Sequence, residues 1–286
     1  TFWSSSVKIG LIPINIGVDS LAKLVDMAQH AEASGLESVW TFEHVIVPLE
    51  YESKYPYNTS GKMGMPPETP MVDPLIALTA VAASTKSLRL GTGVNILSQA
   101  SPLYLAKQAA SLDALSGGRF MLGVGIGWLR EEFAAVGVPF EKRGARFDDY
   151  VTAMRKVWSG EAVEHESEFL SWHGFKSYPV PLQDPLPLVM GGIKGKIHQR
   201  IARYGNGWYA PTNDPAELAG HFDKIRAECD AIGRDFSEIE ITAMWNGRGG
   251  KEESERLEDA GIHRLVVPLF ALGVDPMEAI SKLATS

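Results

Sequence analysis

The sequence predicts an α/β fold, a (β/α)8 TIM barrel with insertions, and three observations support this. Short runs rich in Val, Ile and Leu alternate with amphipathic helical segments, which is typical of parallel sheets. This strand–helix pair occurs eight times. The length of 286 residues suits one barrel of about 250 residues with added loops. No linker or low-complexity segment divides the chain, so one domain is expected over residues 1–286.

Local patterns justify the individual elements. The first expected helix places Leu21, Leu24 and Ala28 on one face, and Gly35 ends it. The acid–proline pair Asp73–Pro74 begins the second helix, and Gly117 ends the third. The expected strands span residues 7–12, 38–42, 88–94, 119–124, 187–190, 207–210, 239–243 and 264–269. The expected helices span residues 18–34, 73–84, 102–115, 147–158, 196–204, 215–232, 252–260 and 276–284.

Two connections are too long to be plain loops. Residues 43–72 contain five prolines and three tyrosines, and long connections in compact domains are usually lids or binding loops. The aromatic residues argue against simple disorder there. Residues 160–184 are expected to form an appended hairpin that serves packing.

Composition excludes several classes of function. The net charge of -8 disfavours binding to nucleic acid or to an anionic membrane, which requires a basic patch. Cys229 is the only cysteine and is expected to be a packing residue. The histidines lack metal-ligand spacing, so no metal site is expected. No apolar run reaches the length of a membrane span, and the first ten residues do not resemble a secretory signal. A cytoplasmic protein is therefore expected.

The sequence WTFEHV ends the second expected strand with Glu43 and His44. Alternate residues of a strand point to opposite faces, so both side chains face inward only if the strand has ended. Sites in (β/α)8 barrels lie at the carboxyl ends of the strands, and a neutral His near pH 7 suits acid–base work. A structural role at an ordinary strand exit is the alternative.

Glycine-rich stretches follow three later strands. LGTGVNIL places Gly91 and Gly93 where a ligand can approach the backbone, or where a bulge forms. GVGIGW is a weak match to a dinucleotide motif because Trp128 occupies the position of the third glycine. VMGGIKGK places paired glycines between a strand end and a helix start, which favours phosphate binding over a plain turn.

Together, these stretches resemble the luciferase-like flavin and deazaflavin oxidoreductases, and most closely the branch that uses coenzyme F420. The matching segments are FEHVIVP, RLGTGV, SPLYLAKQAASLDALSGGRFMLGVGIGWLREEF, RGARFDDY, and the GG and GNGW pair of the second half. They span most of the chain. The resemblance implies a cofactor site at the strand carboxyl ends, hydride transfer, and commonly a homodimer.

The resemblance also implies roles for individual residues. In deazaflavin-dependent relatives an Asp–His pair contacts the ring, and Glu43–His44 occupies that place, with His44 as the acid or base. A cis peptide that backs the ring is expected at Gly93–Val94. The implied cofactor-binding set is Gly93, Val94, Asn95, Gly127, Trp128, Gly191, Gly192, Ile193 and Lys194.

Departures from the family pattern bear on the substrate. The sugar-phosphate dehydrogenases of this family have a carboxylate where this chain has Trp128, and an acid where it has Ile12–Pro13. A less polar, planar or enone-like substrate is therefore expected, against Trp128, Tyr51 and Tyr55. The leading hypothesis is an F420-dependent oxidoreductase acting on a small organic substrate. The alternatives are an FMN-dependent monooxygenase and a non-catalytic cofactor-binding protein.

Overall fold

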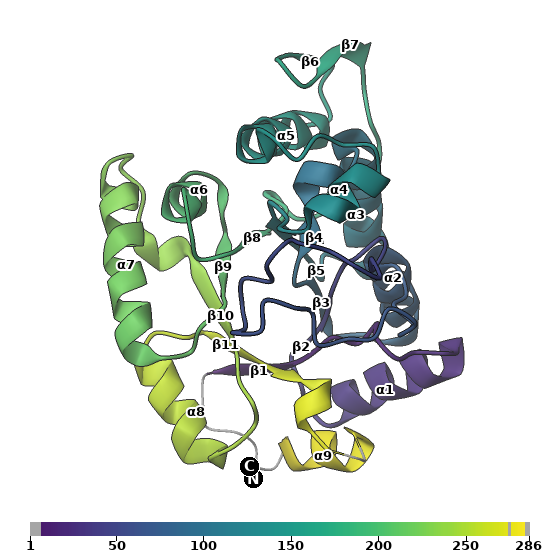
Figure 1. Ribbon diagram of the computed structural model, residues 1–286, viewed down its shortest axis with the longest axis vertical. Coiled ribbons are helices and arrows are strands. Elements are labelled where there is room, and N and C mark those ends of the chain that lie inside the picture. The colour runs from purple at the N-terminus through teal and green to yellow at the C-terminus, as the bar shows by residue number, and fades with distance from the viewer. Residues whose placement is uncertain (1–6, 274–275, 284–286) are drawn as a thin grey trace.

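The computed structural model describes residues 7–273 and 276–283, and within them the chain forms the predicted closed barrel (Figure 1). Eight parallel strands pair in the order β3–β2–β1–β11–β10–β9–β8–β5, and a pairing of β3 with β5 closes the ring. The expected (β/α)8 fold is confirmed. Residues 1–6, where no secretory signal is predicted, and Ala284 of the last expected helix lie outside the described residues.

Each barrel strand is followed by at least one helix on the outside of the ring. The barrel strands are β1 (Lys8–Ile12), β2 (Ser38–Thr41), β3 (Arg89–Thr92), β5 (Phe120–Gly125), β8 (Leu188–Gly191), β9 (Gly207–Ala210), β10 (Glu240–Met244) and β11 (Arg264–Pro268). The helices are α1 (Leu21–Ala33), α2 (Pro74–Ser84), α3 (Pro102–Ser116), α4 (Arg130–Ala135), α5 (Arg143–Trp158), α6 (Ile197–Tyr204), α7 (Pro215–Asp230), α8 (Gly250–Asp259) and α9 (Pro276–Leu283).

The differences from the expected elements are local. Helix α5 begins at Arg143 rather than Phe147, and the short helix α4 before it was not predicted. The third strand stops at Thr92, and a two-residue strand, β4 (Asn95–Ile96), continues its line beside β5. The expected hairpin in residues 160–184 is confirmed as β6 (Val163–Glu166) and β7 (Ser171–Phe175), which project beyond α5 (Figure 1).

Two apolar layers build the core, because successive strand residues point to opposite faces. The outward strand residues pack against the helices in one large cluster that includes Trp208 of β9 and Cys229 of α7. The packing role predicted for Cys229 is confirmed. The inward residues fill the barrel and form a second cluster. This inner cluster consists of Ile12, Trp40, Met121, Val189, Tyr209 and Val266, with Phe42 packed against it.

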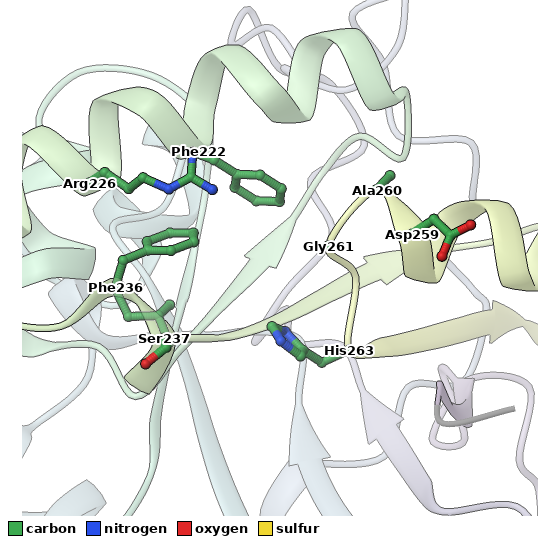
Figure 2. Close-up of a pocket in the computed structure, with 9 residues that line it drawn as sticks. Phe222, Arg226, Phe236, Ser237, Asp259, Ala260, Gly261 and His263 are labelled. Carbon is green, nitrogen blue, oxygen red and sulfur yellow. The ribbon is translucent and has the colours of Figure 1, made fainter.

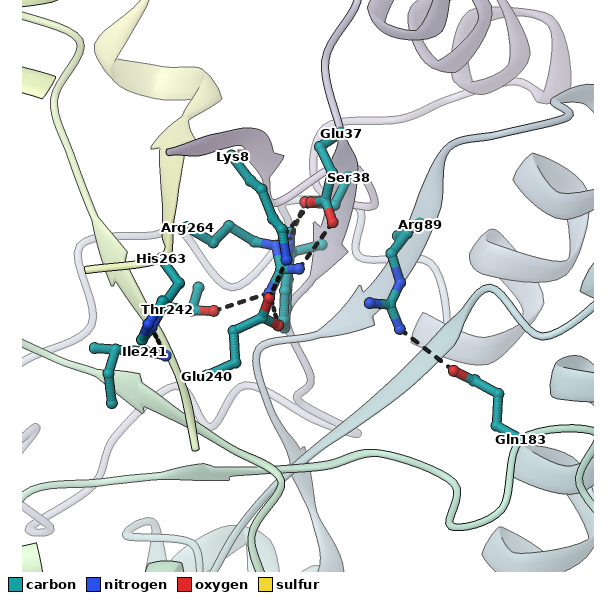
Figure 3. Close-up of polar contacts among 11 residues, drawn as sticks. Lys8, Glu37, Ser38, Arg89, Gln183, Glu240, Ile241, Thr242, His263 and Arg264 are labelled. Atoms are coloured by element: carbon teal, nitrogen blue, oxygen red, sulfur yellow. Dashed lines mark hydrogen bonds and ion pairs between the residues drawn. The ribbon is translucent and has the colours of Figure 1, made fainter. Parts of the chain in front are cut away.

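A network of ion pairs links residues at the amino-terminal ends of the barrel strands (Figure 3). The fully buried Arg264 binds both carboxylate oxygens of Glu37, at 2.7 and 2.8 Å, and one oxygen of Glu240 at 2.7 Å. Lys8 pairs with the other oxygen of Glu240. Burial alone would raise the pKa of Glu240, but the charges and hydrogen bonds of Arg264 and Lys8 lower it from 4.5 to about 2.

We expect Arg264→Met to destabilise the protein by about 3–5 kcal/mol, because it leaves two half-buried carboxylates without their shared cation. The folded pKa of Glu240 lies below its unfolded value, so this stabilisation is present above about pH 4.5 and lost as the pH falls toward 2. Unfolding midpoints of the two proteins should therefore converge on acidification. Arg256→Met, which removes an exposed pair with Glu253, is the matched control and should cost less than about 1 kcal/mol. An equal loss in both variants would contradict the prediction.

Candidate active site at the carboxyl ends of the strands

Asn15 determines how the chain leaves β2. Its side chain is completely buried, and its Nδ2 donates to the carbonyl oxygens of Phe42 at 2.9 Å and Val72 at 2.7 Å. Its Oδ1 accepts from the Phe42 N–H at 3.0 Å. Both ends of the long connection from β2 to α2 are therefore fixed at one point. The backbone groups of Phe42 bond to Asn15 instead of a neighbouring strand, so Glu43 and His44 are released from the strand pleat.

Glu43 turns toward β4. Its carboxylate accepts hydrogen bonds from Asn95 Nδ2 at 2.6 Å and from the Ile96 N–H. Burial raises the pKa of Glu43 to about 7 and outweighs these two donors, and the nearby carboxylates of Glu132 and Asp73 raise it further. Glu43 and Asn95, both predicted site residues, are thus brought into direct contact.

His44 turns toward α4. Its Nδ1 lies 2.8 Å from Glu132 Oε2, and Glu132 Oε1 accepts the Val45 N–H at 2.5 Å. The Glu132 side chain is only 2% exposed. The ring of Trp128 meets the His44 imidazole edge-on, with 6.1 Å between centroids. Nε2 of His44 has no hydrogen-bond partner among the described residues, so it is the nitrogen left free for other chemistry.

The segment Gly93–Val94, here called the wall, leads directly into β4, whose Asn95 and Ile96 bond to Glu43. Gly93 and Val94 are half-buried at the end of β3, and the peptide bond between them is cis, as the family resemblance predicted. The neighbouring strands present Gly125 and Gly191 toward Val94. A Cβ atom on Gly125 would lie 2.9 Å from a Val94 methyl group, and one on Gly191 would lie 2.8 Å away. Glycines are therefore required at both positions for Val94 to occupy its place.

Tyr209 lies beneath this wall. A Cβ atom on Gly93 would lie 3.3 Å from its ring, and its hydroxyl group is buried without a partner among the described residues. Burial raises the Tyr209 pKa, and Tyr55 and Tyr57 of the long connection raise it further. The phenols of three tyrosines therefore lie near one another at the mouth of the barrel.

Trp128 links the rim to the long connection, which crosses in front of the barrel strands in dark blue in Figure 1. Tyr51 and Tyr55 both meet its ring edge-on, at centroid distances of 5.9 and 5.3 Å. Gly127 precedes it with a positive φ, and a Cβ atom there would lie 2.6 Å from Phe133. The predicted aromatic group of Trp128, Tyr51 and Tyr55 is thus assembled.

The glycine turn after β8 has the predicted arrangement of strand end, paired glycines and helix start. Gly191 ends β8, Gly192 has a φ of 123°, and α6 begins at Ile197. The carbonyl of Gly192 accepts the Trp208 indole N–H at 2.9 Å, which anchors the turn. Gly192 and Ile193 are half-buried and Lys194 is exposed, so all three are accessible to a ligand.

Sequence reasoning missed three residues that organise this site: Asn15, Glu132 and Tyr209. Glu132 carried a usable signal, because it lies in the segment that follows β5, and polar residues in the segments after barrel strands can reach the rim where barrel sites are found. Asn15 follows the first strand by three residues and satisfied the same rule. Tyr209 alternates with the outward Trp208, so the pleat alone indicated an inward side chain.

A separate cavity of about 330 Å³ lies at the other end of the barrel, near the starts of β10 and β11 (Figure 2). Arg226 packs over the Phe236 ring there, and His263 Nδ1 accepts the Ile241 N–H at 2.9 Å. Its polar groups serve the packing of α7 and the strand pairing, and the cavity does not reach the rim.

Residues 7–273 and 276–283 contain no group of three or more His, Cys, Asp or Glu side chains suited to a metal ion. In the same ranges no helix is long and apolar enough to cross a membrane.

A closed (β/α)8 barrel with polar side chains gathered at its strand carboxyl ends has the architecture of barrel enzymes. Residues 4–270 match the family model described as luciferase-like monooxygenase, and the chain belongs to that family.

Relatives with different cofactors are similar to this chain. The uncharacterized protein Rv0940c of Mycobacterium tuberculosis is 32% identical over 243 residues, covering 85% of this chain and 83% of that protein. An F420-dependent glucose-6-phosphate dehydrogenase of Kineococcus radiotolerans is 28% identical, covering 80% and 66%. An FMNH(2)-dependent dimethylsulfone monooxygenase of Pseudomonas putida is 25% identical, covering 88% and 66%.

Solved structures share the fold. An F420-dependent secondary alcohol dehydrogenase in complex with an F420-acetone adduct superposes with a TM-score of 0.77 at 17% identity, covering 98% of this chain and 97% of that one. The monooxygenase RslO1 of Streptomyces bottropensis superposes with a TM-score of 0.73 at 22% identity, covering 98% and 97%. At these identities the likeness establishes the fold alone.

We expect Asn15→Ala to destabilise the protein by about 1–3 kcal/mol, because buried backbone groups of Phe42 and Val72 lose their partner. Amide hydrogen exchange should accelerate across residues 43–72. Asn58→Ala is the control, since its bonds to Ser60 and Lys62 lie at the exposed part of the same connection. It should change stability by no more than about 0.5 kcal/mol. Unchanged exchange in Asn15→Ala would show that the amide does not hold the connection.

Proposed function

We propose that this protein is an oxidoreductase that uses coenzyme F420, a deazaflavin, to transfer a hydride to or from a small organic substrate. The observation that carries the proposal is the position of His44. Its imidazole lies on the carboxyl-end rim, where Glu132 holds it and Trp128 borders it, and the preceding residue Glu43 bonds to Asn95, which follows Gly93–Val94. A proton-transfer group at a site that binds the cofactor ring is what hydride transfer to a carbonyl requires.

The residues present fit such a cofactor. Gly125 and Gly191 make room for the Val94 side chain, and the Tyr209 hydroxyl and the side-chain Oδ1 of Asn95 are buried polar atoms without a partner among the described residues, which a cofactor could engage. Gly191, Gly192 and Ile193 would hold the phosphate with their backbone at the start of α6, and Lys194 would meet the anionic tail. Gly127 and Trp128 would border the ring.

When bound, the cofactor supplies or accepts the hydride at C5. His44 Nε2 gives a proton to the substrate oxygen in the reducing direction and takes it back in the oxidising direction. Glu43 would face the ring from beside β4, where Asn95 and the Ile96 N–H hold its carboxyl group in place. Trp128 and the tyrosines of the long connection exclude water from the rim.

The same aromatic residues support a substrate class. Trp128, Tyr51 and Tyr55 offer apolar ring edges where a sugar phosphate would need charged partners. The first strand, β1, ends at Ile12 and Pro13 follows it, and neither residue adds charge. We therefore propose a planar, weakly polar carbonyl or enone as substrate, in a cytoplasmic homodimeric enzyme.

An FMN-dependent monooxygenase is the second candidate. It is supported by the 25% identity to the dimethylsulfone monooxygenase and by the monooxygenases in the family. Both cofactors combine a phosphate with a tricyclic ring, so one site suits either. They differ in chemistry, because the reduced flavin activates oxygen readily whereas carbon replaces the reactive nitrogen in the deazaflavin.

Equilibrium titration of the purified protein with each cofactor separates the two candidates. We expect saturable binding of coenzyme F420, detected by quenching of its fluorescence or of Trp128, and at least about tenfold weaker binding of FMN. Tight binding of FMN with none of the deazaflavin would replace the proposal with the second candidate. Cofactor binding without turnover of any carbonyl, enone or imine substrate would indicate a binding protein.

We expect His44→Ala to lower kcat by about 10²–10⁴-fold with cofactor affinity retained, because the variant lacks the proton-transfer group. Steady-state kinetics over a range of pH measures both the loss and the missing ionisation. His173→Ala, in the exposed β6–β7 hairpin, is the control and should behave as wild type. Full turnover with an unchanged pH profile in His44→Ala would refute the role of His44.

A further inference from the structure

We infer that Glu132 is a positioning residue that fixes the tautomer of His44 and thereby selects Nε2 as the atom that exchanges a proton with the substrate. This inference rests on the proposed function of His44. Its physical basis is one buried carboxylate shared between the side chain of His44 and the backbone of Val45.

The hydrogen bonds around Glu132 dictate where the proton lies. An ionised carboxylate only accepts, so the neutral imidazole must carry its hydrogen on Nδ1, which is 2.8 Å from Oε2. The other oxygen is already committed to the Val45 N–H at 2.5 Å. The lone pair of the neutral ring is therefore on Nε2, the nitrogen without a partner among the described residues.

Packing holds Glu132 where it is. Helix α4 carries it, and the next residue, Phe133, is buried and meets Phe140 edge-on at 5.2 Å. The Phe133 ring also packs close to Gly127, immediately before Trp128. The carboxylate is therefore set by the core rather than by a flexible loop, which keeps the imidazole orientation constant.

The proton balance in the reducing direction is complete. The substrate carbonyl carbon gains a hydride, whose electron pair comes from the reduced cofactor, and its oxygen gains a proton from Nε2. A C–H bond and an O–H bond form on the substrate, while its carbonyl π bond, the C5–H bond that would supply the hydride and the Nε2–H bond break. The imidazole becomes neutral and keeps its Nδ1–H on Glu132, whose negative charge had balanced the imidazolium.

Glu131 supplies a matched control because it is adjacent and performs a different task. Its carboxylate accepts the N–H groups of Glu52 and Ser53 at 2.7 and 3.2 Å, and the Ser53 hydroxyl at 2.7 Å. It anchors the long connection to α4 and has no contact with His44. Replacing either glutamate by glutamine removes one charge from the same turn of α4.

Glu132→Gln should invert the tautomer. The Val45 N–H can only donate, so the amide oxygen must face it, and the amide NH₂ group then faces His44 Nδ1. Nδ1 must accept that bond, which moves the ring proton to Nε2. Glu132→Asp keeps an acceptor-only group and should retain the proton on Nδ1.

The test is ¹⁵N NMR of histidine-labelled protein, with the His44 signals assigned from His44→Ala. We expect the Nδ1–H form in wild type, Glu131→Gln and Glu132→Asp, and the Nε2–H form in Glu132→Gln. In kinetics with coenzyme F420, we expect Glu132→Gln to lose about 10²-fold or more in kcat with little change in KM, and Glu132→Asp to recover part of that loss.

Retention of the Nδ1–H form in Glu132→Gln would overturn the inference, whatever the activity. An inverted tautomer with unchanged kcat would overturn its catalytic part while His44→Ala remains inactive. If His44→Ala also keeps full turnover, it is the proposed function that fails. Cofactor affinity, measured in each variant, verifies that the glutamine variant is folded.

Discussion

The amide of Asn15 is the contact on which the site depends. Three hydrogen bonds tie it to Phe42 and Val72, residues that are 30 positions apart in sequence and both remote from it. Without this amide, β2 would be free to continue its pleat, and Glu43 and His44 would then face opposite sides of one strand. Because the strand ends at the amide, the two side chains diverge along the rim instead, one toward β4 and the other toward α4.

The rim is consequently assembled from neighbours that the turn brings within reach. Glu132 holds the His44 ring and the Val45 backbone, while Glu131 holds the chain seven residues further on. The ring of Trp128 then packs against Tyr51 and Tyr55 of the same connection. The two-turn helix α4 thus fixes the first part of a connection whose far end Asn15 fixes. A segment rich in proline and tyrosine is ordered by polar contacts at its ends and by aromatic contacts in between.

The sequence was sufficient for the barrel, because strand and helix periodicities are local and the eight units needed no knowledge of long-range contacts. It also predicted that Glu43, His44, Gly93 and Trp128 would gather at the strand carboxyl ends, which follows from barrel topology. It did not predict the pairing of His44 with Glu132, since 88 residues separate them and helix α4 is too short to have a clear period. The role of Asn15 was not predicted for the same reason, because its partners Phe42 and Val72 come close to it only in the folded barrel. The catalytic and cofactor-binding roles of these residues stay predictions.

The two rim glutamates show how one acidic protein can accommodate an anionic cofactor. With a net charge of -8, free carboxylates beside a phosphate site would repel the ligand. Here Glu132 is committed to His44 and Val45, and burial raises the Glu43 pKa to about 7, so that its negative charge is partly removed near neutral pH. Lys194 and Lys196 remain exposed at the start of α6. The charge near the rim is therefore less negative than the net charge of the whole chain suggests, which favours the proposed binding of a phosphate at Gly191–Ile193.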